Sequence, residues 1–171
     1  MKESLNNLLT RRAVRKYKSD MVPQDVLDRI LKAGTYAPSG MGKQSAIIIA
    51  ITDRSVRDKL AKINAKVAGK DKDPFYGAPV VIVVLADSSI PTYVEDGALV
   101  LGNLLNAAHA EGFGSCWVHR AKQEFETPFG QELLSSLGIE GKYVGIGHCI
   151  LGYADEDPAP APRKENYIYK I

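Results

Sequence analysis

The stretch GAPVVIVVL, residues 77–85, decides the fold class of this chain of 171 residues. Its apolar residues follow one another without alternation, which is the pattern of a strand whose two faces are both covered. A helix that spans a membrane needs about 20 such residues, whereas the charge-free run from Ala78 to Ala86 has nine. The stretch therefore predicts the central strand of a buried sheet and not a membrane anchor.

Helical and extended patterns alternate on both sides of this strand. Ser4 and Asp53 stand where side chains cap helix N-termini, and Pro23 suits the first turn of a helix. These patterns predict an α+β fold with helices packed around a sheet. Helices are expected over residues 4–9, 23–34, 54–67, 94–112 and 131–137, and strands over residues 46–51, 79–85, 114–118 and 143–151.

The tail, residues 154–171, differs in composition from the rest of the chain. Asp, Glu, Pro and Ala come first, and Pro158, Pro160 and Pro162 favour an extended backbone. The last residues carry two Tyr and two Ile side chains, which need an apolar surface to lie on. We expect one domain over residues 1–171, with the tail packed on a partner subunit.

Charge and compartment follow from the composition. The 22 Lys and Arg residues nearly balance the 20 Asp and Glu residues, so the net charge is +2; this does not favour a nucleic-acid binder. The polar N-terminus lacks the apolar core of a secretory signal, which predicts a cytoplasmic protein. In that reducing compartment Cys116 and Cys149, which have apolar neighbours, are expected to be buried thiols.

Three short motifs resemble nucleotide or metal sites, but each lacks part of its pattern. A P-loop that ended on GMGK, residues 40–43, would need glycine at Ala37. The motif GIG, residues 145–147, lacks the third glycine of a dinucleotide fold and lies inside an expected strand. Cys116 and His119 have the C-x-x-H spacing of a pair of zinc ligands, but the two further ligands that a zinc site needs are missing. We therefore expect no metal site and no dinucleotide fold.

Basic side chains cluster near both ends of the chain. Arg11, Arg12 and Arg15 fall within five positions, and guanidinium groups pair with phosphate oxygens in a bidentate manner. From composition alone a solvated basic patch is the favoured explanation of the same residues, because arginine is mostly exposed. Arg163 and Lys164, which follow the proline-rich segment, have the same two interpretations.

Segments along nearly the whole chain, taken together, resemble the nitroreductase family of FMN-dependent enzymes. No segment is specific alone, but their common order makes chance agreement improbable. The resemblance implies that family's fold, a central mixed sheet flanked by helices with an extended C-terminal tail. The matching segments are RRAVRKY (11–17), APS (37–39) ahead of Gln44, GAPVVI (77–82), Asp96 with NLL (103–105), GSCW (114–117), and GY (152–153) before Arg163 and Lys164.

The resemblance also implies an FMN site in a homodimer. In the family the first basic segment and the C-terminal basic pair bind the phosphate and ribityl chain. The loop from residue 38 to 44 borders the flavin from the other subunit, and residues 117–119 run along the ring system. The chain departs from the family at Ala13, where many members carry Ser, and the contacts of residues 69–76 stay unassigned. The cofactor-binding residues implied are Arg11, Arg12, Ala13, Arg15, Pro38, Ser39, Gln44, Trp117, Val118, His119, Arg163 and Lys164.

The activity that the resemblance implies is a ping-pong transfer of electrons. NADH or NADPH reduces FMN and leaves, after which a small oxidised acceptor such as a nitroaromatic or a quinone takes the electrons. Because the flavin carries the chemistry, no catalytic side chain is expected, and Cys116 is expected to be inert. Two alternatives remain: a flavin-binding protein for storage or sensing, in which NAD(P)H does not reduce the flavin, and a structural domain that binds no FMN.

Overall fold

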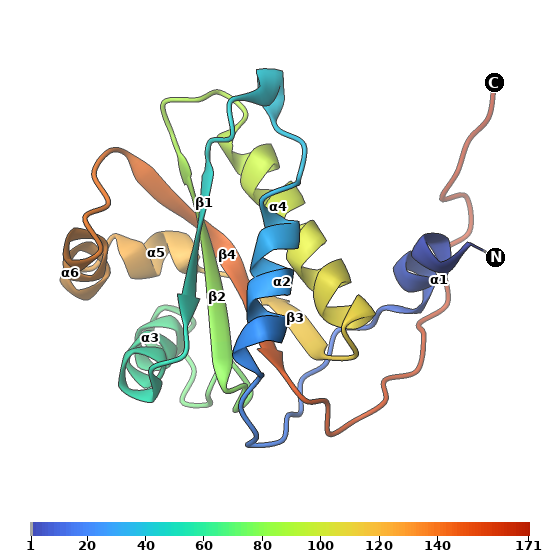
Figure 1. Cartoon of the computed structure of the whole chain (residues 1–171), viewed down its shortest axis with the longest axis horizontal. Helices are drawn as coiled ribbons and strands as arrows, with labels where there is room; N and C mark the ends of the chain where they lie inside the picture. The colour runs from blue at the N-terminus through green and yellow to red at the C-terminus, as the bar shows by residue number, and fades with distance from the viewer. Residues whose placement is uncertain (1) are drawn as a thin grey trace.

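The computed structural model describes residues 2–171, whose strands form one sheet with helices on both faces (Figure 1). The strand order is β1-β2-β4-β3, and every neighbouring pair runs antiparallel. In chain order the elements are α1 Glu3–Thr10, α2 Gln24–Gly34, the 3-10 turn η1 Gly40–Gly42, β1 Ala46–Ile51, α3 Arg54–Val67, β2 Val80–Asp87, α4 Tyr93–Ala110, β3 Gly114–Val118, α5 Ala121–Phe125, α6 Pro128–Ser136 and β4 Tyr143–Gly152.

The sheet has the expected buried centre. All residues of β2 except Asp87 are buried, because β1 and β4 flank the strand and helices cover both its faces. The α+β fold is confirmed, although the four strands themselves are antiparallel. The parallel component of the expected mixed sheet is confined to one bridge, in which Ala13 pairs with Ser115 on the outer side of β3.

Two apolar layers hold the helices on the sheet. Helices α2 and α4 cover one face, where Leu101 and Leu104 are fully buried, and α3 and α5 cover the other, where Leu60 and Phe125 are. Each such side chain stabilises the fold by about 1.5–3 kcal/mol through the apolar surface it removes from water. Among residues 2–171, no helix is both long and apolar enough to cross a bilayer.

Local signals in the sequence predict most element boundaries. Asp53 caps α3, as expected, by accepting a hydrogen bond from the backbone N–H of Val56 at 2.9 Å. The expected cap at Ser4 is wrong, because α1 already begins at Glu3 and its N-cap position is Lys2. The helix expected from residue 131 begins earlier, at Pro128, since the Thr127 side chain caps it. Helix α5 is too short for its periodicity to be visible in the sequence.

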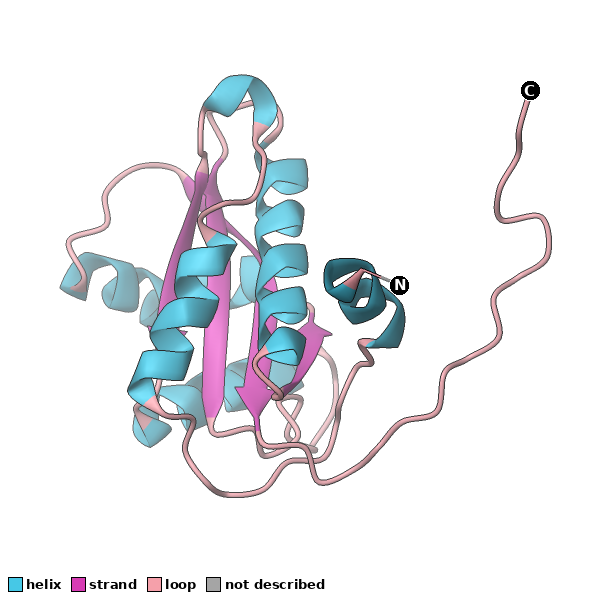
Figure 2. Cartoon of the chain, turned by 45° about the vertical axis from the view of Figure 1, so that its right-hand side comes forward, coloured by secondary structure: helices cyan, strands magenta, loops and turns pink. Residues whose placement is uncertain are grey.

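The two ends of the chain stand apart from this body. Helix α1 has no buried residue, and the tail after Gly152 runs away from the sheet on the same side of the molecule as α1 (Figures 1 and 2). Tyr167, Ile168 and Tyr169 are between 68% and 82% exposed. The tail is extended as expected, and its apolar end is not covered by any other part of residues 2–171.

Candidate functional site

The outer edge of β3 carries the segment that follows α1. The backbone N–H of Val14 donates to the carbonyl oxygen of Ser115 at 3.0 Å, and the Tyr17 hydroxyl donates to the carbonyl oxygen of Val14 at 2.6 Å. Val14 packs on Gly114, where a Cβ atom would lie 2.9 Å from the valine side chain. These contacts fix residues 13–17 beside β3 and hold the neighbouring arginines at the edge of the sheet.

A cavity of about 570 Å³ lies at this point and joins the two basic clusters of the sequence. Arg11, Arg12, Ala13 and Arg15 line one side of the cavity, and Arg163 with the proline-rich part of the tail lines the other. Four guanidinium groups around one hollow repel one another unless an anion lies between them. The cavity therefore has the character of a phosphate site.

Arg12 supports this interpretation by an atom that lacks a partner. Its Nη1 donates to the carbonyl oxygens of Leu9 and Arg11, both at 2.8 Å. Its Nε is buried and has no hydrogen-bond partner among the described residues. Buried N–H groups rarely stay unpaired in native proteins, so an acceptor from a bound molecule fits there. Lys164 does not line this cavity; its Nζ lies 5.2 Å from the centre of the Tyr167 ring.

A second cavity, of about 300 Å³, continues along the edge of β3 and shares Arg15 with the first. Residues 116–120 form one wall, and the end of α3 with residues 68–76 forms the other. Trp117, Val118 and His119, all expected at the site, are therefore brought next to the arginine cavity.

The second cavity is basic. Arg15, Lys70, Lys72 and Arg120 line it against a single acid, Asp73. Burial opposes ionisation of Asp73, but hydrogen bonds from Arg57 and from the backbone N–H groups of Phe75 and Gly77 hold its pKa below the ordinary value. Because the Asp73 carboxylate is engaged by these groups, the cavity keeps a positive potential that suits an electron-rich or anionic guest.

Alternate backbone groups of β3 and of the residue that follows it point away from β4. The carbonyl oxygen of Ser115 accepts from Val14, and that of His119 accepts from the Asn64 side chain, so both point away from β4. Backbone groups alternate along an antiparallel strand, and Trp117 therefore turns its N–H and C=O to this outer edge as well. A flat heterocycle with donors and acceptors along its rim can pair with such an edge.

The loop residues Pro38, Ser39 and Gln44 lie elsewhere. They line a cavity of about 380 Å³ against β1 and α4, and none of them lines the cavities at β3. Asp96 anchors this loop: its carboxylate accepts from the backbone N–H of Gly40 at 2.8 Å and from the Ser45 hydroxyl at 2.7 Å. One chain therefore does not bring the loop and the β3 edge into one site.

The cysteines are buried as expected. Cys116 is 3% exposed, and its Sγ lies 3.5 Å from the carbonyl oxygen of Trp117. Burial raises the pKa of the Cys116 thiol, against the opposing effect of Arg15 and Arg11, and it raises that of Cys149 to about 12. Both groups are thiols at neutral pH and therefore weak nucleophiles. Among residues 2–171 no group of three His, Cys, Asp or Glu residues is arranged for a metal ion.

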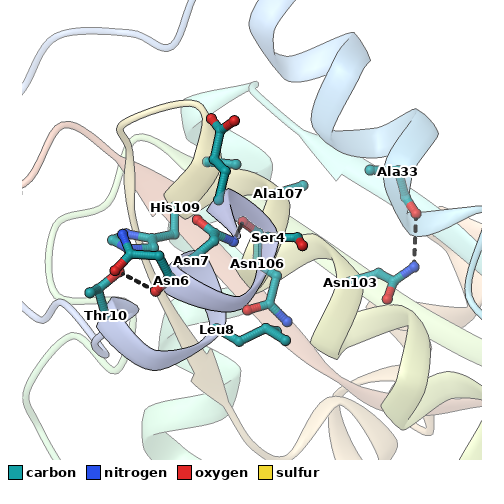
Figure 3. Close-up of a pocket in the computed structure, with 12 residues that line it drawn as sticks. Ser4, Asn6, Asn7, Leu8, Thr10, Ala33, Asn103, Asn106, Ala107 and His109 are labelled. Atoms are coloured by element: carbon teal, nitrogen blue, oxygen red, sulfur yellow. Dashed lines mark hydrogen bonds between the residues drawn. The ribbon is translucent and has the colours of Figure 1, made fainter. Parts of the chain in front are cut away.

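The largest of these cavities, about 680 Å³, separates α1 from α4 (Figure 3). It is lined mainly by small and amide side chains, and few contacts cross it. Asn7 donates to the carbonyl oxygen of Asn106 at 2.9 Å, and Thr10 Oγ lies 2.9 Å from His109 Nε2. The hollow carries no cluster of charged groups comparable to that at β3, so it is not the candidate site.

Among the lining residues of the β3 cavities that sequence reasoning missed are two lysines, one asparagine and one arginine. Lys70 and Lys72 belong to the loop of residues 69–76, whose contacts the sequence leaves unassigned. Their positive charges are the sequence signal that could have placed them at an anion site. Asn64 lies on an apolar helix face, and Arg120 follows the strand in a left-handed conformation, with φ at 80°. Only the fold brings these two residues to the cavity.

Comparison with known proteins identifies relatives for this arrangement. The family model described as "Nitroreductase family" matches residues 8–153. A protein of Methanothermobacter thermautotrophicus, provisionally named NADH dehydrogenase/NAD(P)H nitroreductase, is 33% identical over 158 residues, which are 90% of this chain and 78% of that protein. A Bacteroides fragilis nitroreductase crystallised with bound FMN is 26% identical, with a TM-score of 0.90 over 100% of both chains. A Desulfitobacterium hafniense nitroreductase with bound FMN superposes with a TM-score of 0.89 at 23% identity, over 100% of this chain and 99% of that one.

Proposed function

This chain belongs to the nitroreductase family, and from that premise we propose that it is an FMN-dependent oxidoreductase. It takes electrons from NADH or NADPH and passes them to a small oxidised acceptor. The observation that carries the proposal is the pair of neighbouring cavities along the outer edge of β3, which share Arg15: one is lined by four arginines, and the other by residues 116–120 and two lysines.

The residues present fit FMN, which joins a phosphate to a flat ring system through a flexible chain. Arg11, Arg12, Arg15 and Arg163 suit the phosphate, and the unpaired Nε of Arg12 supplies a donor for it. Ala13 lacks the hydroxyl that many family members place here, which removes one hydrogen bond, worth about 1 kcal/mol. The surplus of arginines offsets that loss.

The ring system suits the second cavity. The outward N–H and C=O of Trp117 can pair with the rim of the ring, and Lys70 and Lys72 bring positive charge to the same place. When bound, FMN supplies a two-electron store that accepts hydride from a nicotinamide and yields it to an acceptor. Trp117, Lys70 and Lys72 would hold and orient the ring along the edge of β3, and the protein would supply no nucleophile.

The active unit we propose is a homodimer. The loop with Pro38, Ser39 and Gln44 then completes the site of the partner subunit, which explains why it lies apart from the β3 edge of its own chain. Two features need a partner. Helix α1 has no buried residue, with Leu5, Leu8 and Leu9 about half exposed, and the end of the tail is uncovered.

The proposed acceptors are nitroaromatics and quinones, which are flat and readily reduced. The test is to saturate the purified protein with FMN and measure initial rates with NADH or NADPH and a nitrobenzoate or a benzoquinone. Saturable reduction with parallel double-reciprocal lines is expected, since the two substrates use one site in turn. FMN that binds without being reduced would instead indicate flavin storage or sensing, and a failure to bind FMN would overturn the proposal.

A further inference from the structure

Three polar side chains are buried in the apolar layer between the sheet and helices α3 and α5. Asn64 of α3, Glu124 of α5 and His148 of β4 each have 0% exposure. Nδ2 of Asn64 donates to Glu124 Oε1, and Glu124 Oε2 lies 2.7 Å from Nε2 of His148. The three therefore form one chain of hydrogen bonds, which the proposed electron transfer does not use.

Both ends of this chain bind backbone at the end of β3. Nδ1 of His148 lies 3.0 Å from the carbonyl oxygen of Val118, and Nδ2 of Asn64 donates to the carbonyl oxygen of His119 at 2.8 Å. A carbonyl oxygen only accepts, so Nδ1 of His148 carries a proton. One proton between Nε2 and Glu124 completes the chain, whichever of the two atoms holds it.

The segment held in this way turns sharply. Arg120, the next residue, has φ at 80°, which is uncommon for a side chain other than glycine. Its carbonyl oxygen accepts from the backbone N–H of Glu124 at 3.1 Å. Such conformations persist only where surrounding contacts over-determine them. Glu124 therefore contacts this segment twice: its side chain belongs to the buried chain of hydrogen bonds, and its backbone N–H donates to the carbonyl oxygen of Arg120 in the first turn of α5.

We propose that Asn64, Glu124 and His148 are positioning residues, which hold the backbone of residues 118–120 in the shape that the FMN site needs. This inference rests on the proposed function, since residues 117–120 line the cavity assigned to the ring system. Apolar side chains would fill the same space without the cost of burying polar groups. The three polar side chains are explained by what they bind, namely the consecutive carbonyl groups of Val118 and His119 next to the site.

Substitutions at Glu124 test whether this side chain positions the backbone of residues 118–120 or only fills space in the apolar layer. In Glu124→Gln, the amide can donate to His148 and its oxygen can accept from Asn64, so the chain of hydrogen bonds survives. We expect FMN affinity within threefold of the wild type. Glu124→Leu keeps a similar volume but breaks the chain, and we expect FMN affinity to fall at least tenfold, with a shifted midpoint potential of the bound flavin.

Asn64→Leu is a second test of the positioning role, with Leu60→Ala as its matched control. Leu60 lies one turn earlier on α3, is fully buried in the same layer, and does not touch residues 118–120 by hydrogen bonds. We expect both variants to lose thermal stability, but only Asn64→Leu to lose at least tenfold in FMN affinity. Equal affinity losses in the two variants, or in Glu124→Gln and Glu124→Leu, would overturn the proposal.

A readout without cofactor separates this inference from the proposed function. Trp117 is the only tryptophan of the chain, so its emission in the FMN-free protein reports on the end of β3. Asn64→Leu should shift this emission and speed hydrogen exchange at residues 118–121, while Leu60→Ala should leave both as in the wild type. If the wild type fails to bind FMN, the proposed function fails, and these two signals alone decide whether the buried chain positions the segment. Unchanged signals in Asn64→Leu would show that it does not.

Discussion

At the scale of single residues, the arginines of the β3 cavity are the groups whose removal should matter most. Arg11→Ala and Arg15→Ala each delete a charge-assisted contact of about 1.5–3 kcal/mol, so FMN affinity should fall by roughly 10- to 150-fold. Thermal stability of the FMN-free protein should change little. Arg54→Ala is the control, because Arg54 is 93% exposed and its ion pair with Asp58 lies outside the cavity. Flavin fluorescence titration measures the affinities. Unchanged affinities in both variants would show that these arginines form a solvated patch and do not bind the phosphate.

Cys116 is the residue most easily mistaken for a catalytic group, because it lies beside Trp117 in the second cavity. Burial raises the pKa of its thiol, so it stays protonated at neutral pH, and FMN already stores the electrons. Cys116→Ala, loaded fully with FMN, should therefore keep most of its NAD(P)H-dependent activity. Stopped-flow measurement of the acceptor half-reaction tests this. A thousandfold loss in a folded, loaded variant would show that the thiol takes part.

At the scale of elements, the loop before β1 depends on one carboxylate of α4. Asp96 is 2% exposed and accepts from Ser45 and Gly40. In Asp96→Asn only the amide oxygen accepts, so either the Gly40 N–H or the Ser45 hydroxyl loses its acceptor, which should destabilise the protein by about 1–3 kcal/mol at neutral pH. Urea unfolding of this variant and of the wild type measures the difference, with exposed Asp20→Asn as the control.

The same carboxylate predicts the pH dependence of that difference. Hydrogen bonds from Ser45 and then Gly40 lower the pKa of Asp96, despite its burial. The folded state therefore binds the proton less readily than the unfolded state, and the stability that Asp96 confers is present above its ordinary pKa and is lost as pH falls through the folded value. The gap between wild type and Asp96→Asn should narrow below about pH 4. A gap that is the same at pH 3 and pH 7 would contradict this account.

Secondary elements with strong local signals are those that the sequence predicts well. The apolar run of β1 and the cap at Asp53 predict observed boundaries, because burial and capping act over a few neighbouring residues. Helix α5 escapes prediction, since it is short and begins after the left-handed Arg120. The same distinction holds for the candidate site. The cluster of arginines in residues 11–15 is a local sequence signal that predicts an anion site, whereas Asn64 and Arg120 reach the site only through the packing of α3 and α5.

At the scale of the whole molecule, the uncovered tail predicts the assembly. Deleting residues 167–171 removes Tyr167, Ile168 and Tyr169 but keeps Arg163 at the cavity. The wild type should sediment at twice 18.6 kDa, and the shortened chain should dissociate at concentrations where the wild type does not. Substituting the exposed Lys170 by Ala is the control. A wild type that stays monomeric at micromolar concentration with FMN bound would exclude a site shared between subunits.

Anaerobic titration of the FMN-loaded protein with NADH and with NADPH tests the central claim most directly. If the β3 edge holds FMN for electron transfer, one of the two nicotinamides should bleach the visible flavin absorbance with a stoichiometry of one per bound FMN. Addition of a benzoquinone should then restore the colour. A bound flavin that keeps its absorbance under an excess of both nicotinamides would contradict the account, because the protein would then hold FMN without using it.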